Sequence, residues 1–408
     1  MKIIRIGIGC LLSFAVFAHG GVEAWSEAVL VVGASLLLVL WAVLVCFGRT
    51  RSIRWDALLA PLAALAAFGF VQWLLGWTAS PYLTRIELLK FSAILILVFL
   101  AVQSFRTTAN WLGFAWFLLV LAFVVSVFGI IQHFTFNGKL YWLRELRYGG
   151  IPFGPYVNRN HFAGLVELIA PVGLAILVLR GVRRDQLPLV ALFTLLPVGA
   201  LFLAASRGGI TSILAEVALL GLLVWARRGM RRSLAAAAAV VILAAGVVAW
   251  LGVGRALDRF TSFQKLEVSE ARRVSIVKDS WRIFLDHPVR GTGLGTLQVV
   301  YPRYESVYDG KFANHAHNDY VELLTETGVI GALCFAVFLL LLFRRSWNEI
   351  RATLNPQDLA LRMGALVACA GLLVHSLVDF NLHIPANALL FYLLAVMASS
   401  AARPDQDL

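Results

Sequence analysis

Charged residues are scarce in this chain. Only 14% of its 408 residues are Asp, Glu, Lys or Arg, 60% are hydrophobic, and the mean hydropathy is +0.82. A soluble domain typically carries about 25% charged and about 45–50% apolar residues. The composition therefore excludes an ordinary soluble domain and indicates a membrane protein.

Cysteine and acidic residues are also few. The four cysteines, Cys10, Cys46, Cys334 and Cys369, lie inside apolar runs without metal-ligand spacing, so we interpret them as small core residues. Lys and Arg outnumber Asp and Glu by 35 to 23, for a net charge of +12. Because most of these cations lie in short clusters between apolar runs, membrane topology explains them and nucleic acid does not.

Long apolar runs recur along the whole chain, and roughly 18 residues suffice to cross a bilayer as a helix. We predict an all-α polytopic membrane protein with about twelve spans, which forms a single integral membrane domain over residues 1–408. The first span is a retained helix in the favoured interpretation and a signal peptide in the alternative one. The predicted spans are approximately 4–19, 27–48, 57–77, 88–105, 111–133, 161–180, 187–205, 209–226, 233–254, 320–343, 359–378 and 386–401.

The basic residues orient these spans. With the N-terminus inside, the inner segments are rich in arginine, whereas the short outer loops hold only Arg85, Lys90 and Arg207. Two long outer segments follow from this topology, at residues 134–160 and 255–319, and long loops translocate regardless of their charge. We expect the larger one to carry part of the active site.

The same topology places five polar residues at the outer face: His161, Arg207, Arg273, His317 and Asp379. They are far apart in sequence, so their common face makes a plausible site. Groups at the outer face cannot reach cytoplasmic nucleotide sugars or ATP. The chemistry must then use an activated donor that has already been carried across the membrane.

The longest polar segment, at about residues 254–320, ends in His315-Ala316-His317-Asn318-Asp319-Tyr320. Cations together with an imidazole suit a substrate that carries phosphate and a hydroxyl that must lose a proton. Arg207, in a short turn, either snorkels to the interface or offers its planar fork to phosphate oxygens.

Within this segment, residues 270–285 are predicted to form a helix that Pro288 ends. Its apolar stripe comprises Val274, Val277, Trp281, Phe284 and Leu285, so we expect it to lie on the membrane surface or on the bundle. Gly291-Thr292-Gly293-Leu294-Gly295 follows no βαβ strand, which excludes a nucleotide site. These glycines let the backbone approach either a ligand or a neighbouring helix.

The roles of the Asn158–Asn160 pair and of Glu167 each have two possible interpretations. Asn158 or Asn160 either caps the helix that begins near His161 or faces a sugar or phosphate. Glu167 is ionisable within a span, which is costly in lipid. It therefore lies near the site or is a structural carboxylate that faces the bundle.

Four motifs in this order resemble one family. They are Asn158-Arg159-Asn160-His161-Phe162-Ala163-Gly164; Ser206-Arg207-Gly208; Arg273 fifteen residues before Pro288 of the His287–Gly293 segment; and the His315–Tyr320 motif followed by Glu326-Thr327-Gly328-Val329-Ile330-Gly331. Together they resemble the O-antigen ligase and O-antigen polymerase superfamily of bacterial envelope glycosyltransferases, over about residues 158–390.

The resemblance implies a multi-pass glycosyltransferase of the bacterial inner (plasma) membrane, with a site that faces the periplasm or cell exterior. The donor would be a polyprenyl-diphosphate-linked glycan. The acceptor would be lipid A-core in the ligase branch or another lipid-linked glycan in the polymerase branch, and a related branch glycosylates proteins. The implied partners are these substrates and membrane lipids, with no nucleic acid, and neither a metal nor another cofactor is expected.

The resemblance maps the family's essential arginines onto Arg207 and Arg273, where they would hold the diphosphate, and its histidine onto His317. Fixed arginines stabilise the charge of the leaving group, and an imidazole can take the hydroxyl proton. No nucleophilic carboxylate pair is evident, so direct displacement would invert the anomeric centre. His315 is an alternative base, and His161 and His287 are weaker ones.

The remaining predicted site residues bind substrate: Asn158, Asn160, His161, His315, Asn318 and Asp379. Asp379 positions an arginine or the acceptor, or it caps the helix after Pro385. The turn that contains Asp379 resembles polymerase and exopolysaccharide members more than ligases. The alternative function is a polysaccharide or lipid-linked oligosaccharide transporter or flippase, but transporters usually place their polar residues near the bilayer midplane, and here they cluster at one face.

Overall fold

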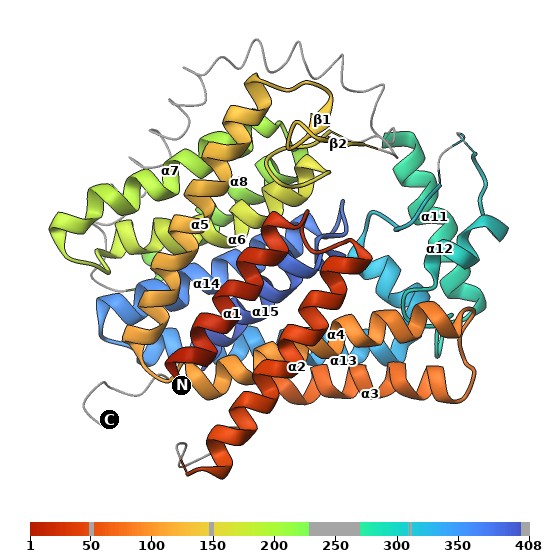
Figure 1. Cartoon of the computed structure of the whole chain (residues 1–408), viewed down its shortest axis with the longest axis horizontal. Helices are drawn as coiled ribbons and strands as arrows, with labels where there is room; N and C mark the ends of the chain where they lie inside the picture. The colour runs from red at the N-terminus through yellow and green to blue at the C-terminus, as the bar shows by residue number, and fades with distance from the viewer. Residues whose placement is uncertain (49–52, 147–150, 228–269, 309, 311, 401–408) are drawn as a thin grey trace.

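A computed structural model describes residues 1–48, 53–146, 151–227, 270–308, 310 and 312–400 (Figure 1). These residues are almost entirely helical, which confirms the all-α prediction. The long helices are α1 (Lys2–Phe17), α2 (Ala24–Cys46), α3 (Leu59–Leu74), α4 (Pro81–Ser104), α5 (Thr108–Phe134), α6 (Arg159–Leu179), α7 (Leu187–Ala204), α8 (Arg207–Ala226), α11 (Glu270–Asp286), α13 (Asp319–Ala352), α14 (Pro356–His375) and α15 (Pro385–Ser399).

Short elements connect the long helices. They are the antiparallel pair β1 (Lys139–Leu140) and β2 (Arg144–Glu145), the helix α12 (Leu297–Val300), and the single-turn helices η1 (Arg184–Gln186), η2 (Tyr301–Arg303) and η3 (Asn381–His383). The strand pair lies in the smaller predicted outer loop. Helices α11 and α12 with η2 lie in the described part of the larger one.

Eight helices of the described residues are long and apolar enough to cross a membrane: α2, α4, α5, α6, α7 together with η1, α8, α13 and α14. The shorter apolar helices α3 and α15, and the 16-residue α1, occupy further predicted spans. The predicted span 233–254 lies outside the described residues. The structure therefore gives eight candidate spans and does not establish the predicted twelve.

Helices α6 and α14 form the centre of the bundle. The most apolar windows of α6 and α14 are 94% and 83% buried, whereas that of α2 is 11% buried. The two helices pack against each other, and α14 also packs against α8 and α15. Gly364 allows this approach, because a Cβ there would lie 2.6 Å from the Cα of Val172 in α6. Charged groups near the ends of α6 and α14 are therefore held by the most deeply buried helices of the described residues.

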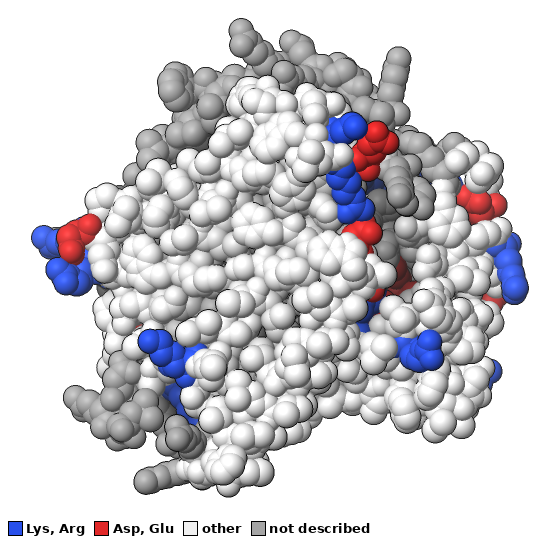
Figure 2. Space-filling model, in the orientation of Figure 1, with Lys and Arg blue, Asp and Glu red and all other residues white. Residues whose placement is uncertain are grey.

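The N-terminal helices form the periphery of the bundle. Figure 2 shows a face that is mostly free of charge, with Lys, Arg, Asp and Glu confined to its edges and to a hollow. Cys10 and Cys46, on α1 and α2, are exposed, and of the four cysteines only Cys369 is buried. The prediction that all four are core residues is wrong, because an apolar run in a membrane protein can face lipid as well as the core.

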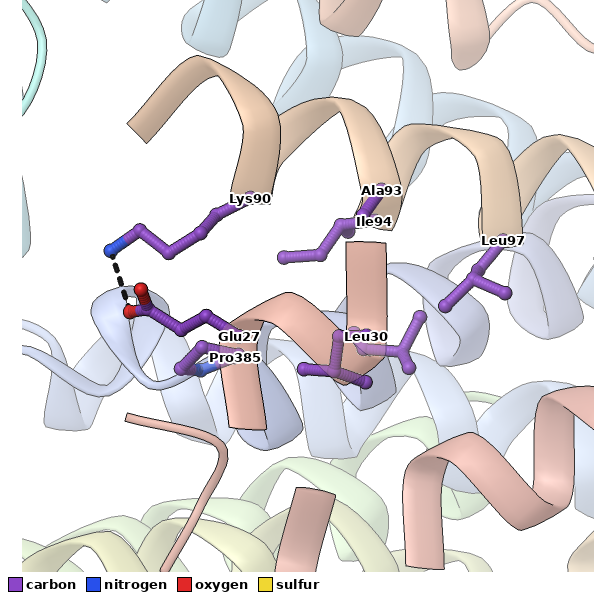
Figure 3. Close-up of a pocket in the computed structure, with 8 residues that line it drawn as sticks. Glu27, Leu30, Lys90, Ala93, Ile94, Leu97 and Pro385 are labelled. Atoms are coloured by element: carbon purple, nitrogen blue, oxygen red, sulfur yellow. Dashed lines mark ion pairs between the residues drawn. The ribbon is translucent and has the colours of Figure 1, made fainter. Parts of the chain in front are cut away.

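Charges inside the N-terminal helices are paired. The Nζ of Lys90 on α4 lies 2.6 Å from Glu87 and 3.3 Å from Glu27 of α2. Figure 3 shows the Lys90–Glu27 pair at the polar end of a pocket between α2, α4 and α15, with Leu30 and Leu97 further along it. The pairing reduces the cost of placing an ammonium group within a span.

Helix α11 confirms the predicted helix before Pro288, but its buried face differs from the predicted apolar stripe. Ile276 and Ile283 are buried, and the carbonyl of Ser280 accepts a hydrogen bond from Thr325 of α13 at 3.1 Å. The exposed side chains include Val274, Trp281 and Leu285. The side of α11 that packs against α13 is therefore opposite to the predicted apolar stripe. The periodicity of apolar residues does not reveal which side of a helix meets a neighbour.

The segment Gly291–Gly295 packs against a kink in α13. Gly328 interrupts that helix with φ 61° and ψ −161°. The amides of Thr292 and Gly293 donate to the carbonyls of Thr325 and Glu326 at 3.0 and 2.9 Å. Of the two predicted roles for these glycines, approach to a neighbouring helix is the one observed.

Replacing Gly328 by alanine should destabilise the fold. Its positive φ strains any L side chain, at roughly 1–3 kcal/mol, and a Cβ would collide with the backbone of Val289. We expect a lower melting temperature in detergent. Gly113→Ala is the matched control, because nothing lies within 4 Å of a Cβ at this helical position. Equal melting temperatures for the two variants would contradict the assigned kink.

Candidate functional site

The carboxylate of Asp379 is the point at which three predicted site residues meet. Its Oδ2 accepts a hydrogen bond from Nδ2 of Asn160 at 2.6 Å. Its Oδ1 lies 3.8 Å from Nε2 of His161 and 3.7 Å from Nδ1 of His317. Asp379 is fully buried, so these partners replace the water that an ionised carboxylate would otherwise need.

Local hydrogen bonds hold this arrangement in place. Helix α14 ends at His375, whose carbonyl accepts from the amide of Asp379 at 3.1 Å. The Nδ2 of Asn318 donates to the carbonyl of Leu377 at 2.9 Å, which ties the histidine loop to this turn. His317 has φ 53°, a left-handed conformation that is rare for a residue other than glycine and that is enriched at functional sites.

Phe380 packs against three imidazoles. The ring of His315 stacks on it with centroids 4.2 Å apart, and the rings of His161 and His317 meet it edge-on at 4.8 and 5.0 Å. The aromatic ring fixes the orientation of these imidazoles. It also covers one side of the site with apolar surface, which strengthens the interactions of nearby charges.

The electrostatics favour an ionised Asp379. Burial by itself would raise the pKa of Asp379, but the interactions with His161 and His317 hold it well below its usual range. Among the described residues, Nδ1 of His317 has no hydrogen-bond partner, and it faces Asp379. Because the Asp379 carboxylate faces Nδ1 of His317, the other ring nitrogen, Nε2, is the one that can accept a proton. The His317 side chain is 14% exposed.

A second polar cluster adjoins the first. Glu322 is buried, and its two oxygens lie 2.7 Å from Nδ1 of His315 and from the amide nitrogen of Ala316. His383 places Nδ1 2.8 Å from Asp319 and Nε2 3.4 Å from Glu322. Burial opposes a charge on His383, but Glu322 and Asp319 raise its pKa to about 10. Sequence analysis missed Glu322, Asp319 and His383 as members of one group.

Arg273 lies on α11, the helix that packs near the histidine loop. Ile276, one helical turn further along, belongs to the same buried cluster as Ala316. Arg273 is half-buried, and its Nε has no hydrogen-bond partner among the described residues. The preceding arginine is bound differently, because Arg272 pairs with Glu305 and lies over the ring of Tyr301.

Arg207 begins α8 and is exposed. The amide of Gly209 donates to the Ser206 hydroxyl at 3.2 Å, so Ser206 caps this helix. A Cβ at Gly208 would lie 2.5 Å from His375 and 3.2 Å from Val378. The first turn of α8 therefore packs against the end of α14, immediately before Asp379.

The segment that carries both arginines and the histidine loop has known relatives. Residues 191–336 match the O-antigen ligase family. This segment is therefore similar to the O-antigen ligase family. The resemblance drawn from the motifs is thereby confirmed. The matched segment includes Arg207, Arg273 and His317, whereas Asn160, His161 and Asp379 lie outside it.

The chain is also similar to the teichuronic acid biosynthesis protein TuaE of Bacillus subtilis (strain 168). The two sequences are 24% identical over 368 residues, which covers 84% of this chain and 73% of the relative. This similarity extends beyond residues 191–336 and covers most of the chain.

Two predicted substrate-binding residues of the candidate site are helix caps. Oδ1 of Asn158 accepts from the amide of Asn160 at 2.9 Å. Oδ1 of Asn318 accepts from the amides of Tyr320 and Val321, both at 3.0 Å. Of the two interpretations of this pair, helix capping is the one observed for Asn158. Asn160 instead donates a hydrogen bond to Asp379. A direct role of Asn158 or Asn318 toward a substrate stays a prediction.

Glu167 faces the bundle, behind the candidate site. It is fully buried, and its oxygens lie 3.0 and 3.1 Å from Nδ1 of His375. A Cβ at Gly209 would lie 2.9 Å from Oε1 of Glu167. The Glu167–His375 pair therefore links α6 to α14 beneath the helix that begins with Arg207, and sequence analysis did not identify His375.

The depressed pKa of Asp379 predicts a pH-dependent contribution to stability. A carboxylate with a lowered folded-state pKa stabilises the fold above its unfolded pKa, which is about 3.9, and loses this effect as the pH falls below that value. Asp379→Asn should lower the melting temperature at pH 7, and the difference from the original protein should shrink below about pH 4. Melting curves across this range measure it, and a gap that stays constant with pH would contradict an ionised Asp379.

Proposed function

We propose that the protein is a membrane glycosyltransferase that moves a glycan from a polyprenyl-diphosphate carrier to an acceptor hydroxyl. The O-antigen ligase match and the relative in teichuronic acid biosynthesis support a membrane enzyme of cell-surface polysaccharide synthesis. The observation that carries the proposal is the pairing of His317 with buried Asp379, beside the segments that hold Arg207 and Arg273.

Arg207 and Arg273 hold the diphosphate in this proposal. Breaking the bond between C1 of the sugar and the diphosphate oxygen leaves the electron pair on the leaving group. Guanidinium groups fixed at that position stabilise the developing charge and match phosphate oxygens in geometry. Neither arginine is fully buried, so both can reach a head group at the membrane surface. The transfer is metal-independent in that no step requires a metal ion.

His317 is the base. As the acceptor oxygen forms its bond to C1, its proton passes to Nε2 of His317, while Asp379 stabilises the resulting imidazolium. Asp379 thus orients a histidine rather than an arginine or a helix end. A single displacement of this kind inverts the anomeric centre. Asn160 and His161 lie beside Asp379, and His315 stacks on Phe380; these three residues are proposed to contact the sugar or phosphate.

The protein is proposed to lie in the bacterial inner (plasma) membrane, with this site facing the periplasm or cell exterior. The distribution of arginine supports that orientation, and Asn160, His317 and Asp379 lie at one end of the bundle, next to the ends of α6, α13 and α14. An activated lipid-linked donor is the substrate available there. The proposed acceptor is lipid A-core or a second lipid-linked glycan.

The glycan profile of a null mutant distinguishes the acceptors. Loss of long chains with a single repeat retained on lipid A would identify a polymerase, and accumulation of carrier-bound polymer would identify a ligase. Lipid-linked repeats stranded on the cytoplasmic side would instead identify a transporter and would refute the proposed transfer.

Two single substitutions test the residue roles. His317→Ala removes the base and Arg273→Ala removes a charge from the leaving-group site. A base or a preorganised hydrogen-bond donor typically increases the reaction rate by about 10²–10⁴-fold. We therefore expect both variants to lose glycan transfer while expression stays intact. The measurement is an envelope glycan gel together with transfer from a defined lipid-linked donor in vitro.

Lys278→Ala is the matched control on α11, because Lys278 is an exposed cation of the same helix. This variant should retain transfer. Full polymer in either His317→Ala or Arg273→Ala would disprove the assignment. Equal loss in Lys278→Ala would point to general surface charge rather than to a specific site.

A further inference from the structure

In the second polar cluster His315 meets Glu322 and His383, two residues that have no role in the proposed transfer. One nitrogen from each histidine and one oxygen of Glu322 all lie within 4.8 Å of one another. The three side chains come from different elements: the loop before α13, the first turn of α13, and η3. Sequence spacing gives no hint of this convergence, since 61 positions separate Glu322 from His383.

We propose that His315, Glu322 and His383 bind a divalent transition-metal ion, with Zn²⁺ as the best match. Two imidazole nitrogens and one carboxylate oxygen form a donor set that zinc commonly takes, with water in the fourth position. The mixed nitrogen and oxygen donors favour Zn²⁺ and other divalent first-row transition metals over Mg²⁺ or Ca²⁺, which prefer oxygen ligands. The family resemblance implied no metal, so this site goes beyond it.

Both distances from Glu322 lie near those that an ion of this size requires, and the three donor atoms are within 4.8 Å of one another. With metal–ligand bonds of about 2.0–2.1 Å, neighbouring ligands of a tetrahedral zinc lie about 3.3 Å apart. Nε2 of His383 is 3.4 Å from Oε1 of Glu322, and Nδ1 of His315 is 2.7 Å from the same oxygen. Binding therefore requires the His315–Glu322 separation to open by roughly 0.6 Å.

Neighbouring groups already orient two of the ligands. Nδ1 of His383 pairs with Asp319 at 2.8 Å, which leaves Nε2 to face the cluster. The other oxygen of Glu322 accepts from the amide of Ala316 at 2.7 Å. A carboxylate behind a metal-binding histidine is the usual way in which proteins fix the ring and increase its basicity. Two buried carboxylates, Asp319 and Glu322, also favour a cation between them.

The position of the ion suggests a structural role. It would join the loop that carries His317 to η3, which begins two residues after Asp379. The stacking of His315 on Phe380 links the same elements. A metal at this position would fix the separation between the proposed base and its carboxylate without contacting the diphosphate.

The test measures the zinc content of the full-length protein, purified with a tag that contains no histidine. We expect about one zinc per chain by mass spectrometry, and a higher melting temperature with added Zn²⁺ than after chelation. His383→Gln and His315→Gln should each lower the zinc content at least tenfold and remove the zinc-dependent shift. His315 is 31% exposed, so its replacement provides a variant that should fold if His383→Gln does not.

Two control variants separate this inference from the proposed function. His317→Ala should lose transfer and keep its zinc, because His317 is not a ligand, and Lys278→Ala should keep both. Zinc at background levels in the original protein, with no shift on its addition, would leave only a hydrogen-bonded imidazole–carboxylate network and would overturn the proposal. Zinc retained by both His383→Gln and His315→Gln would place the ion elsewhere and would overturn it as well.

Discussion

The arrangement of the site depends on one buried carboxylate. Asp379 is fully buried, and its histidine neighbours hold its pKa well below the usual range, so the surrounding elements must supply partners for its charge. They do so from the first turn of α6 through Asn160 and His161, and from the loop before α13 through His317. A charge that is costly to leave unpaired thereby fixes the relative positions of three segments that are distant in the chain.

The central helices make such a site possible. Helices α6 and α14 approach closely at Gly364, and their polar groups are paired, as Glu167 is with His375. Polar groups within a membrane must find partners in the protein, because lipid offers none. The same requirement explains Lys90 between Glu27 and Glu87. Close packing and paired polar groups at these buried helices position the proposed catalytic groups.

Much of the architecture could be predicted from hydropathy. All predicted spans apart from 233–254, which lies outside the described residues, coincide with helices, and the residues grouped by topology include three that meet: His161, His317 and Asp379. The roles of individual side chains were less predictable. Asn158 and Asn318 are caps, the stripe on α11 faces outward, and Asp379 contacts histidines rather than an arginine. Each of these depends on which neighbour a helix meets.

The sequence by itself determined the class of protein, the approximate spans and the family, because hydrophobic length and short motifs are local properties of the chain. Only the tertiary structure decided that Glu322 meets His315 and His383, that Phe380 packs against three imidazoles, and that Glu167 pairs with His375. Those contacts join residues up to 219 positions apart, as Asn160 and Asp379 are. The physical reason is that helix packing, which local sequence does not encode, brings such residues together.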